Sequence, residues 1–377
     1  MGSSQFILLI TTVLSFASLY VLQPILPSLS RVFGVSQADA TLLVSISMFP
    51  LAVAPIFYGY FLRSISARRL LIITVTVMAV TQLVFAYAPG YQVALASRFV
   101  LGLALPASFT ALMTIFASLA PAEKVRQAMG VYIATTIVGG FAGRILGGVL
   151  TATLNWQAPF ITMAVLLSIN AFLLTRLDVD RGMQISRPGF SIISTTLARG
   201  EFLYSYLTIF CVFFVFAGVL NNLPFRLEEI DPGIRESAIA MIYSGYLIGI
   251  VTALGANRLS VLLGSETRAL IMALVVYFIA TALFAIASPS ALLINVFIFS
   301  IGMFAVHSIL SAGVNHRAGD NKSVVNGLYI AIYYTGGSLG AWLPAYLYST
   351  LGWNNLLHAL NGVLVIAFMT SLRIRRG

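Results

Sequence analysis

Twelve long apolar stretches follow one another through this chain, and they constrain its fold more than any other feature of the sequence. A helix that crosses the hydrocarbon core of a bilayer needs about 20 mostly apolar residues. Strands of a membrane barrel would instead be about 10 residues long and would alternate in polarity. The stretches are therefore predicted to be membrane-spanning helices at residues 6–27, 41–62, 70–88, 92–117, 129–150, 157–175, 202–223, 238–260, 269–287, 291–313, 327–348 and 356–372.

The composition excludes a soluble protein. Only 8% of the residues are charged, against about 25% in soluble domains, so the chain lacks the charge for a large water-exposed surface. We therefore predict an all-α polytopic membrane protein with twelve transmembrane helices and a lipid bilayer as its surroundings. The single cysteine, Cys211, excludes a disulfide within the chain.

Basic residues gather in alternate loops between the predicted spans. With the N-terminus in the cytoplasm, 16 of the 21 Lys and Arg residues fall in cytoplasmic segments, three in external segments and two within spans. Short cytoplasmic loops of membrane proteins carry such an excess, so both termini are expected to be cytoplasmic. The net charge of +10 is then a signal for membrane orientation, and no nucleic-acid partner is expected.

The chain divides into two similar halves. The longest polar interruption, 178–200, predicts a cytoplasmic linker between an N-terminal six-helix bundle, 1–177, and a C-terminal six-helix bundle, 201–377. A shift of 197 positions aligns residues 130–156 with 327–353, including several glycines and one tryptophan. Internal repeats of this kind are typical of secondary transporters, with the site at the interface between the repeats. We therefore predict two six-helix bundles related by an internal repeat.

Glycines recur at every fourth position in the fifth and eleventh predicted spans. Small residues at this spacing share one helix face and let helix backbones approach closely. The plainer interpretation is close helix packing. The functional hypothesis is a conformational seam on which the two halves pivot, formed by Gly139, Gly143, Gly147, Gly336 and Gly340.

Three local motifs accompany this twelve-span plan. The loop after the second span reads GYFLRSISARR, with Gly59, Arg68 and Arg69 in the motif positions. The fourth span carries Arg98 with a glycine four residues later, and the fifth carries GGFAGRILGG at 139–148. With its duplicated plan, the chain resembles the major facilitator superfamily, and specifically its twelve-span bacterial efflux-type permeases.

The resemblance implies alternating-access transport across the bacterial inner membrane. It also implies a cytoplasmic gate loop that contains Gly59, Arg68 and Arg69. The glycine motif of the fifth span resembles that of antiporters in the family, which favours efflux. The chain departs from the family pattern at Arg63, where an acidic residue is usual, and at Arg144, where a proline is usual.

Two arginines, Arg98 and Arg144, lie within predicted spans. A central arginine costs roughly 2.5–3.5 kcal/mol on insertion scales, and all eleven acidic residues lie in loops or at span ends. At 1.5 Å per residue, both arginines are placed about 9 Å from the outer ends of their helices. The functional hypothesis is a positive site for an anionic or zwitterionic solute. The alternative is that each arginine is a structural strut bonded to helix carbonyl groups.

Other candidate residues follow from polarity within the spans. With no carboxylate there, His307 in the tenth span is the candidate for proton coupling, since its unperturbed pKa is about 6.5. The alternative is a core histidine bonded to a neighbouring carbonyl group. The remaining substrate-binding candidates are polar and aromatic side chains of spans one, seven, eight and eleven: Tyr20, Gln23, Asn221, Asn222, Tyr243, Tyr246 and Tyr333.

The chain has no phosphate-binding loop, no cluster of residues with metal-ligand spacing and no nucleophile with a neighbouring base. No enzyme activity, cofactor or metal site is therefore expected. We predict a monomeric secondary active transporter that exports a small organic solute, with protons as the coupling ion. Uptake or exchange of the same solute class is one alternative, and a non-transporting receptor on a transporter scaffold is another.

Overall fold

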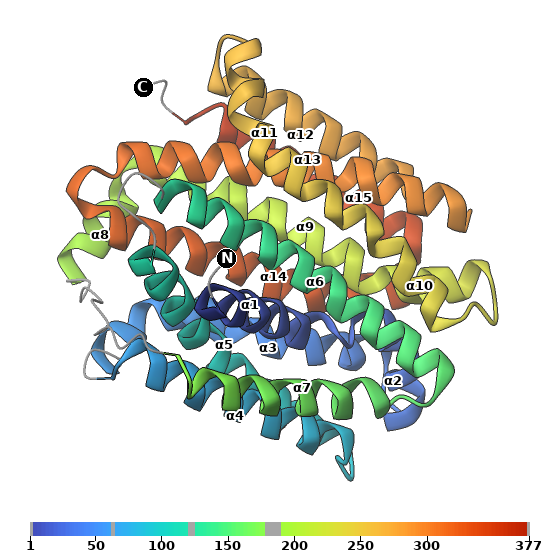
Figure 1. The fold of residues 1–377 in the computed structure, drawn as a ribbon. Helices are drawn as coiled ribbons and strands as arrows, with labels where there is room; N and C mark the ends of the chain where they lie inside the picture. Colours follow the sequence, from blue (N-terminus) through green and yellow to red (C-terminus); the bar gives the residue numbers. More distant parts are fainter. Residues whose placement is uncertain (1–2, 62–64, 120–124, 178–189, 375–377) are drawn as a thin grey trace.

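The computed structural model describes residues 3–61, 65–119, 125–177 and 190–374. Within these ranges the chain is almost entirely helical and contains no strand. The long helices run roughly alongside one another, as Figure 1 shows, which is the arrangement of a bundle that crosses a membrane. The prediction of an all-α membrane protein is confirmed.

The first group of helices precedes the central linker. It comprises α1 (Ser3–Tyr20), the 3-10 turn η1 (Gln23–Ile25), α2 (Leu26–Phe33), α3 (Gln37–Phe61), α4 (Ala67–Ala86), α5 (Tyr91–Leu119), α6 (Val125–Thr153) and α7 (Ala158–Leu174). In the described part of the chain, one short helix, α8 (Phe190–Ala198), lies between this group and the next.

The second group follows the linker. It comprises α9 (Gly200–Ile230), α10 (Glu236–Ile242), the 3-10 turn η3 (Tyr243–Leu247), α11 (Ile248–Leu262), α12 (Glu266–Leu283), α13 (Pro289–Arg317), η4 (Gly319–Asn321), α14 (Lys322–Leu351) and α15 (Trp353–Ser371). In the described ranges, nine helices are long and apolar enough to cross a membrane, and α7 is apolar but shorter. Each of the twelve predicted stretches coincides with a helix or with a broken helix.

Two of the predicted spans are broken rather than continuous. The first consists of α1, η1 and α2, and the eighth consists of α10, η3 and α11. In the first span Pro24 and Pro27 have no N–H groups, so they cannot donate to the carbonyl groups four residues earlier. Discontinuous helices supply many transporter sites, and both breaks here lie beside the site described below.

The helices pack in two groups that meet along two lines. In the first group α1 packs on α6, and α4 packs on α5 and α7. In the second group α9 packs on α14 and α15, and α12 packs on α13. The groups meet where α3 packs along α14 and where α6 packs along α10 and η3. In Figure 1, α6 and α14 lie between the other helices of the two groups.

The glycine seam lies inside each group, which differs from the expectation that it separates the two halves. A Cβ atom at Gly139 would stand 2.7 Å from the carbonyl oxygen of Val13, and at Gly143 it would overlap the carbonyl group of Ala17. The absence of a side chain at these glycines therefore lets α6 pack closely against α1. The other three seam glycines behave alike: Gly147 abuts Val21, while Gly336 and Gly340 abut the backbone of Phe210 and Phe214 in α9.

A second face of α6 meets the other half. A Cβ atom at Gly148 would overlap the carbonyl oxygen of Glu236 in α10, and at Gly140 it would lie 3.4 Å from the Tyr246 ring of η3. Residues four apart share a helix face, so Arg144 stands between these two glycines. The sequence therefore gives α6 one glycine face for its own half and another, with Arg144 in it, for the opposite half.

Candidate functional site

Arg144 is the polar centre of the region where the two halves meet. Its side chain is 1% exposed. Its Nε atom donates to Oε1 of Gln23 at 2.6 Å, and its Nη1 atom donates to the carbonyl oxygen of Gly140 at 2.9 Å. Among the described residues, it forms no ion pair. A buried cation without a carboxylate partner is costly in a membrane, so other groups must stabilise its charge.

Three tyrosine rings surround the Arg144 guanidinium. Its carbon lies 4.3 Å from the ring centre of Tyr20, 4.7 Å from that of Tyr246 and 5.1 Å from that of Tyr243. A cation within about 6 Å of an aromatic face is attracted by the ring, and more strongly where water is excluded. Tyr20 belongs to the first half and the other two to the second, so the cage is complete only when both halves meet.

The neighbouring backbone explains how Tyr243 is held. Pro224 lies inside α9 and cannot donate to the carbonyl group of Leu220. The Tyr243 hydroxyl donates to that carbonyl oxygen at 2.7 Å. The proline in α9 thus creates a free acceptor, and the acceptor fixes the tyrosine whose ring faces Arg144.

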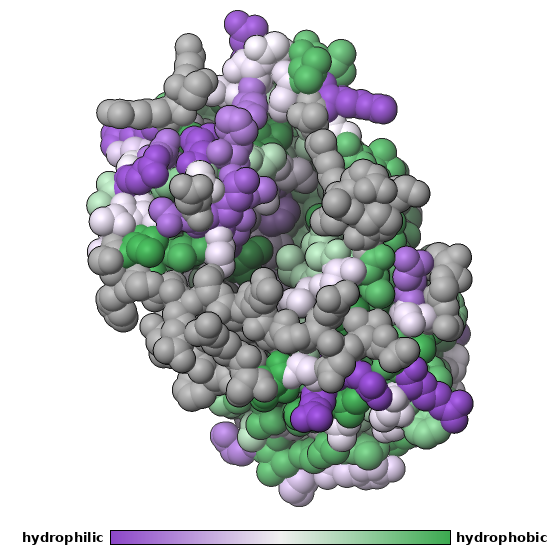
Figure 2. Space-filling model, turned by 60° about the vertical axis from the view of Figure 1, so that its left-hand side comes forward, coloured by the Kyte–Doolittle hydropathy of each residue, from purple (hydrophilic) through white to green (hydrophobic). Residues whose placement is uncertain are grey.

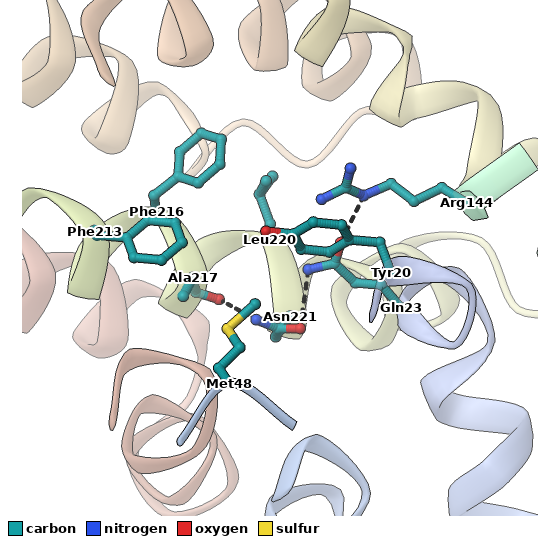
Figure 3. A pocket seen from close by; sticks show the side chains of 9 residues that line it. All are labelled: Tyr20, Gln23, Met48, Arg144, Phe213, Phe216, Ala217, Leu220 and Asn221. Atoms are coloured by element: carbon teal, nitrogen blue, oxygen red, sulfur yellow. Dashed lines mark hydrogen bonds between the residues drawn. The ribbon is translucent and has the colours of Figure 1, made fainter. Parts of the chain in front are cut away.

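A small pocket opens beside Arg144 between the two halves (Figure 3). Its free space holds about one water molecule. One side is polar, and the other is formed by apolar side chains of α9 together with Met48 of α3. The lining residues are Tyr20, Gln23, Met48, Arg144, Phe213, Phe216, Ala217, Leu220 and Asn221.

Gln23 and Asn221 connect the two halves across this pocket. The Gln23 Nε2 atom donates to Oδ1 of Asn221 at 2.9 Å, and the Asn221 amide donates to the carbonyl oxygen of Ala217 at 2.8 Å. A second pair of the same chemistry lies nearby, because Gln37 Nε2 donates to Oδ1 of Asn222 at 2.8 Å. We call these two pairs the glutamine–asparagine bridges. Only the first touches Arg144.

Arg98 is equally buried but occupies a different environment. It is 1% exposed, and its guanidinium donates to the carbonyl oxygens of Ser18 and Leu19, both at 3.0 Å, and to the Ser47 hydroxyl at 2.9 Å. Carbonyl groups in the last turn of a helix lack intrahelical partners, and α1 ends at Tyr20. All three acceptors lie in the first half, and Arg98 does not line the pocket.

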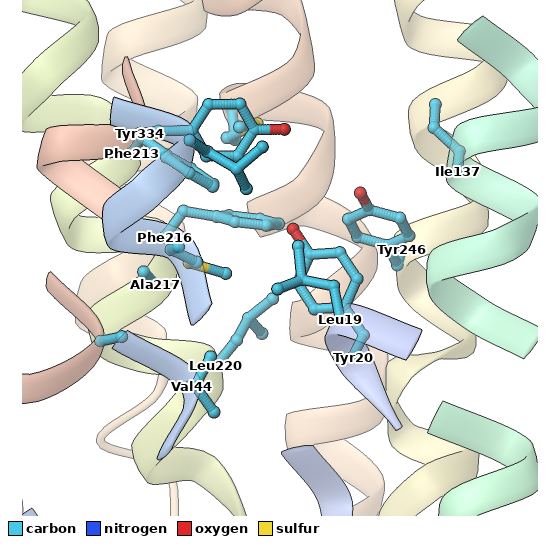
Figure 4. Close-up of a cluster of buried hydrophobic side chains, with 14 of the residues drawn as sticks. Leu19, Tyr20, Val44, Ile137, Phe213, Phe216, Ala217, Leu220, Tyr246 and Tyr334 are labelled. Atoms are coloured by element: carbon cyan, nitrogen blue, oxygen red, sulfur yellow. The ribbon is translucent and has the colours of Figure 1, made fainter. Parts of the chain in front are cut away.

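The aromatic lining continues from the pocket into the second half (Figure 4). The rings of Phe213 and Tyr333 stack with their centres 3.8 Å apart, and Tyr333 lies 4.9 Å from the ring of His307. The Tyr329 hydroxyl lies 3.1 Å from Nδ1 of His307 and 3.2 Å from its carbonyl oxygen. His307 is half-buried and is thus linked to the pocket through Tyr333.

The motif loop after α3 is only partly described. Gly59 lies within α3, whereas residues 62–64, including Arg63, lie outside the described ranges. Ser66 is the N-cap residue of α4, and its hydroxyl accepts a hydrogen bond from the backbone N–H of Arg69 at 3.4 Å. Arg68 donates to the carbonyl oxygen of Thr175 beyond the end of α7, so it joins two helices of the same half.

Further hydrogen bonds join the two halves at two levels of the described structure. They lie at mid-depth, where Ser45 and Ser338 bond to each other, and toward the end formed by α2 and α10. The opposite end of this boundary is the one where α8 lies. Figure 2 brings the α8 end forward and shows a hollow in its surface with hydrophilic side chains along one side. At the α2–α10 end the bonds are Arg31–Glu228, Ser28–Glu236 and Arg235 to the carbonyl oxygen of Ala152.

Sequence reasoning missed the apolar side of the pocket. Phe213, Phe216 and Leu220 carry no polar signal, and a phenylalanine that faces a pocket resembles one that faces lipid. Met48 was missed because the second predicted span contains no charged residue, except Arg63 just beyond it, to draw attention to that helix, and Gln37 was missed because it lies just before that span. The free carbonyl group created by Pro224 was a detectable signal, because Asn221 and Asn222 stand directly beside it.

The fold and its central pocket define a class: helical membrane transporters with a site between two groups of helices. The chain belongs to the major facilitator superfamily, whose family model matches residues 8–341. This confirms the family resemblance. The family and its curated relatives are transporters rather than enzymes.

Two curated relatives cover nearly the whole chain. An uncharacterized MFS-type transporter, YybF, of Bacillus subtilis (strain 168) is 25% identical over 368 residues, which cover 95% of this chain and 89% of that protein. The inner membrane transport protein YnfM of Escherichia coli (strain K12) is 26% identical over 368 residues, which cover 96% and 88%. This chain is therefore similar to multi-pass bacterial transport proteins along almost all of its length.

Solved structures support the same fold. A bacterial homolog of the human lysosomal transporter Spinster, in an inward-facing and occupied conformation, aligns with a TM-score of 0.77 at 15% identity and covers 98% of this chain and 95% of that one. The nucleoside transporter NupG aligns with a TM-score of 0.79 at 13% identity and covers 99% and 100%. At these identities the likeness concerns the fold.

Proposed function

We propose that this protein is a secondary active transporter that moves a small anionic or zwitterionic organic solute across the bacterial inner membrane by alternating access. The observation that supports this proposal best is the environment of Arg144. Its guanidinium is buried between the halves, faces three tyrosine rings and has no carboxylate partner among the described residues. An anion that enters the pocket supplies the missing negative charge.

The proposed domains are the two bundles predicted from the sequence, 1–177 and 201–377, joined by the linker 178–200. With the linker in the cytoplasm, the α8 end is the cytoplasmic end and both termini are cytoplasmic. The bonds between α2, α9 and α10 then close the external side. Rocking of one bundle against the other exchanges this closure for one at the cytoplasmic side.

Proton-coupled efflux is the proposed mode of transport, with the protein acting as a monomer. His307 supports the coupling proposal, because it is an ionisable group that contacts the pocket aromatics through Tyr333. The glycine motif of α6 supports efflux through its resemblance to antiporters. Uptake or exchange of the same solutes remains the alternative, with the same site used in the opposite direction.

Flux into proteoliposomes tests this function. Vesicles that contain the protein are given an outward or inward pH gradient and a panel of radiolabelled carboxylates, amino acids and organic cations. Proton-coupled transport predicts accumulation of at least one anion or zwitterion that depends on the gradient and disappears with a proton ionophore. A His307→Gln variant is expected to retain exchange of that solute but to lose accumulation. If the protein moves none of the panel, or if only organic cations move, the proposed function is wrong.

The receptor alternative has a different outcome. A non-transporting receptor binds a solute without any flux under either gradient. Saturable solute binding without flux in either direction would support the receptor function instead.

A further inference from the structure

Gln23 links the candidate cation to the opposite half of the molecule through one amide group. It is 2% exposed. Its Oε1 atom accepts from Arg144 at 2.6 Å, and its Nε2 atom donates to Asn221 at 2.9 Å. Figure 3 shows this chain of hydrogen bonds along the polar side of the pocket. Gln23 thus bonds at the same time to Arg144 and to Asn221 of the second half.

The orientation of the Gln23 amide follows from its neighbours. A guanidinium nitrogen only donates, so the group that faces Arg144 must be the amide oxygen. The Asn221 amide nitrogen is used by the carbonyl group of Ala217, so its oxygen faces Gln23. The network has a single consistent arrangement, and within it a neutral oxygen occupies a position on the guanidinium that a carboxylate oxygen would occupy more strongly.

The pocket has no room for a solute while Gln23 holds this place. The free space is that of about one water molecule. An organic solute must therefore displace a lining group, and Gln23 is the lining group that competes for the same donor. The apolar part of the lining consists of Met48 of α3 and Phe213, Phe216, Ala217 and Leu220 of α9. A single cation facing an apolar wall is complementary to one negative charge on an apolar body.

We propose that Gln23 holds the place of the substrate on Arg144, and that a monoanionic carboxylate with an apolar body displaces it and so releases the bridge to Asn221. This inference rests on the proposed function, in which the same pocket binds the transported solute. Displacement removes one of the two glutamine–asparagine bridges between the halves. Binding of the solute at Arg144 thereby weakens the contact between the two bundles.

The two bridges provide a matched pair of variants. Gln23→Ala removes the bridge that touches Arg144, and Gln37→Ala removes the bridge that does not. Binding of benzoate to the purified full-length protein in nanodiscs is measured by calorimetry. Loss of a competing hydrogen bond predicts that Gln23→Ala binds benzoate about fivefold more tightly than Gln37→Ala. Gln23→Glu places a tethered carboxylate on Arg144 and is expected to abolish benzoate binding while the protein melts at or above the wild-type temperature.

Equal affinities for the two alanine variants, or weaker binding by Gln23→Ala, would overturn the placeholder role, because Gln23 would then act as a general strut or as a direct substrate contact. Normal benzoate binding by Gln23→Glu would overturn it as well. The wild-type protein is also tested with benzamide, benzylamine and glutarate. Glutarate binding better than benzoate would overturn the apolar monoanion class but leave the anion-transport proposal intact. If no carboxylate binds any variant and none is transported, the proposed function itself fails.

Discussion

At the scale of single residues, the two buried arginines have different surroundings. The sequence does not distinguish the two arginines, since both lie at a similar predicted depth and no acidic residue lies within a predicted span. Every hydrogen-bond acceptor of Arg98 belongs to the first half, whereas the tyrosines around Arg144 come from both halves. The strut interpretation therefore suits Arg98, and the substrate-binding hypothesis rests on Arg144.

Arg98→Ala is expected to destabilise the protein. The substitution leaves the carbonyl groups of Ser18 and Leu19 without donors at the break of the first span, at a cost of about 3 kcal/mol. Lysine is expected to rescue stability only partly, because it lacks the planar fork that reaches several acceptors. The melting temperature of purified variants, with solute affinity measured on the same samples, checks this. An unchanged melting temperature together with lost affinity would place Arg98 in the binding site instead.

At the scale of helices, the sequence predicts the spans better than their interruptions. Each of the twelve stretches predicted from hydrophobic length coincides with a helix or a broken helix, because a bilayer requires long apolar runs. The breaks at η1 and η3 depend on local bonding that hydropathy does not record. Pro24 and Pro27 were visible in the sequence, but a proline inside a membrane helix is often tolerated. In this chain the span does break, and Arg98 of α5 donates to the carbonyl groups of Ser18 and Leu19 next to the break.

Which helix each glycine face contacts could be learned only from the structure. A repeat of four residues predicts a close helix contact but does not say with which helix. Gly143 meets Ala17 of the same half, whereas Gly148 meets Glu236 of the other half. The two glycine faces of α6 are one residue apart in sequence, as Gly147 and Gly148 show. The first face packs inside its own bundle, and the second packs against the other bundle.

Gly143→Leu is therefore expected to impair folding of the first bundle rather than its rocking. A side chain there overlaps the backbone of Ala17 in α1, and overpacking of this kind costs about 1–3 kcal/mol. Gly130→Leu, in the same helix, is the control, since a Cβ atom there has open space. Yield and melting temperature should fall for Gly143→Leu alone. A stable Gly143→Leu protein that lacks transport would restore the pivot hypothesis.

At the scale of the whole molecule, the described hydrogen bonds close one end of the boundary between the bundles. The ion pair of Arg31 with Glu228, at 2.7 Å, joins α2 to α9. Exposed ion pairs contribute about 0–1 kcal/mol, so one pair shifts the balance between conformations without determining it.

Arg31→Glu is expected to open this end, because like charges then face each other. The double variant Arg31→Glu with Glu228→Arg is expected to restore closure. Spin-label distances across the α2–α10 end, measured in a background without Cys211, check both. Identical distance distributions in the wild type and the single variant would show that the ion pair plays no part in closure.

Orientation in the membrane is a further prediction at this scale. The excess of basic residues in alternate loops predicts that both termini face the cytoplasm. Fusions of a cytoplasm-active and a periplasm-active reporter to the C-terminus check it. Activity of the periplasmic reporter would contradict the proposed topology and would place the α8 end outside.

The central claim is that Arg144 binds the negative charge of the transported solute between the two bundles. The most direct measurement is the affinity of purified Arg144→Ala and Arg144→Lys for a transported solute, with the melting temperature recorded on the same samples. Loss of at least tenfold in affinity for alanine, partial recovery for lysine and an intact fold in both are predicted, since lysine keeps the charge but not the bidentate fork. Wild-type affinity in a destabilised Arg144→Ala protein would contradict the claim and assign Arg144 a structural role.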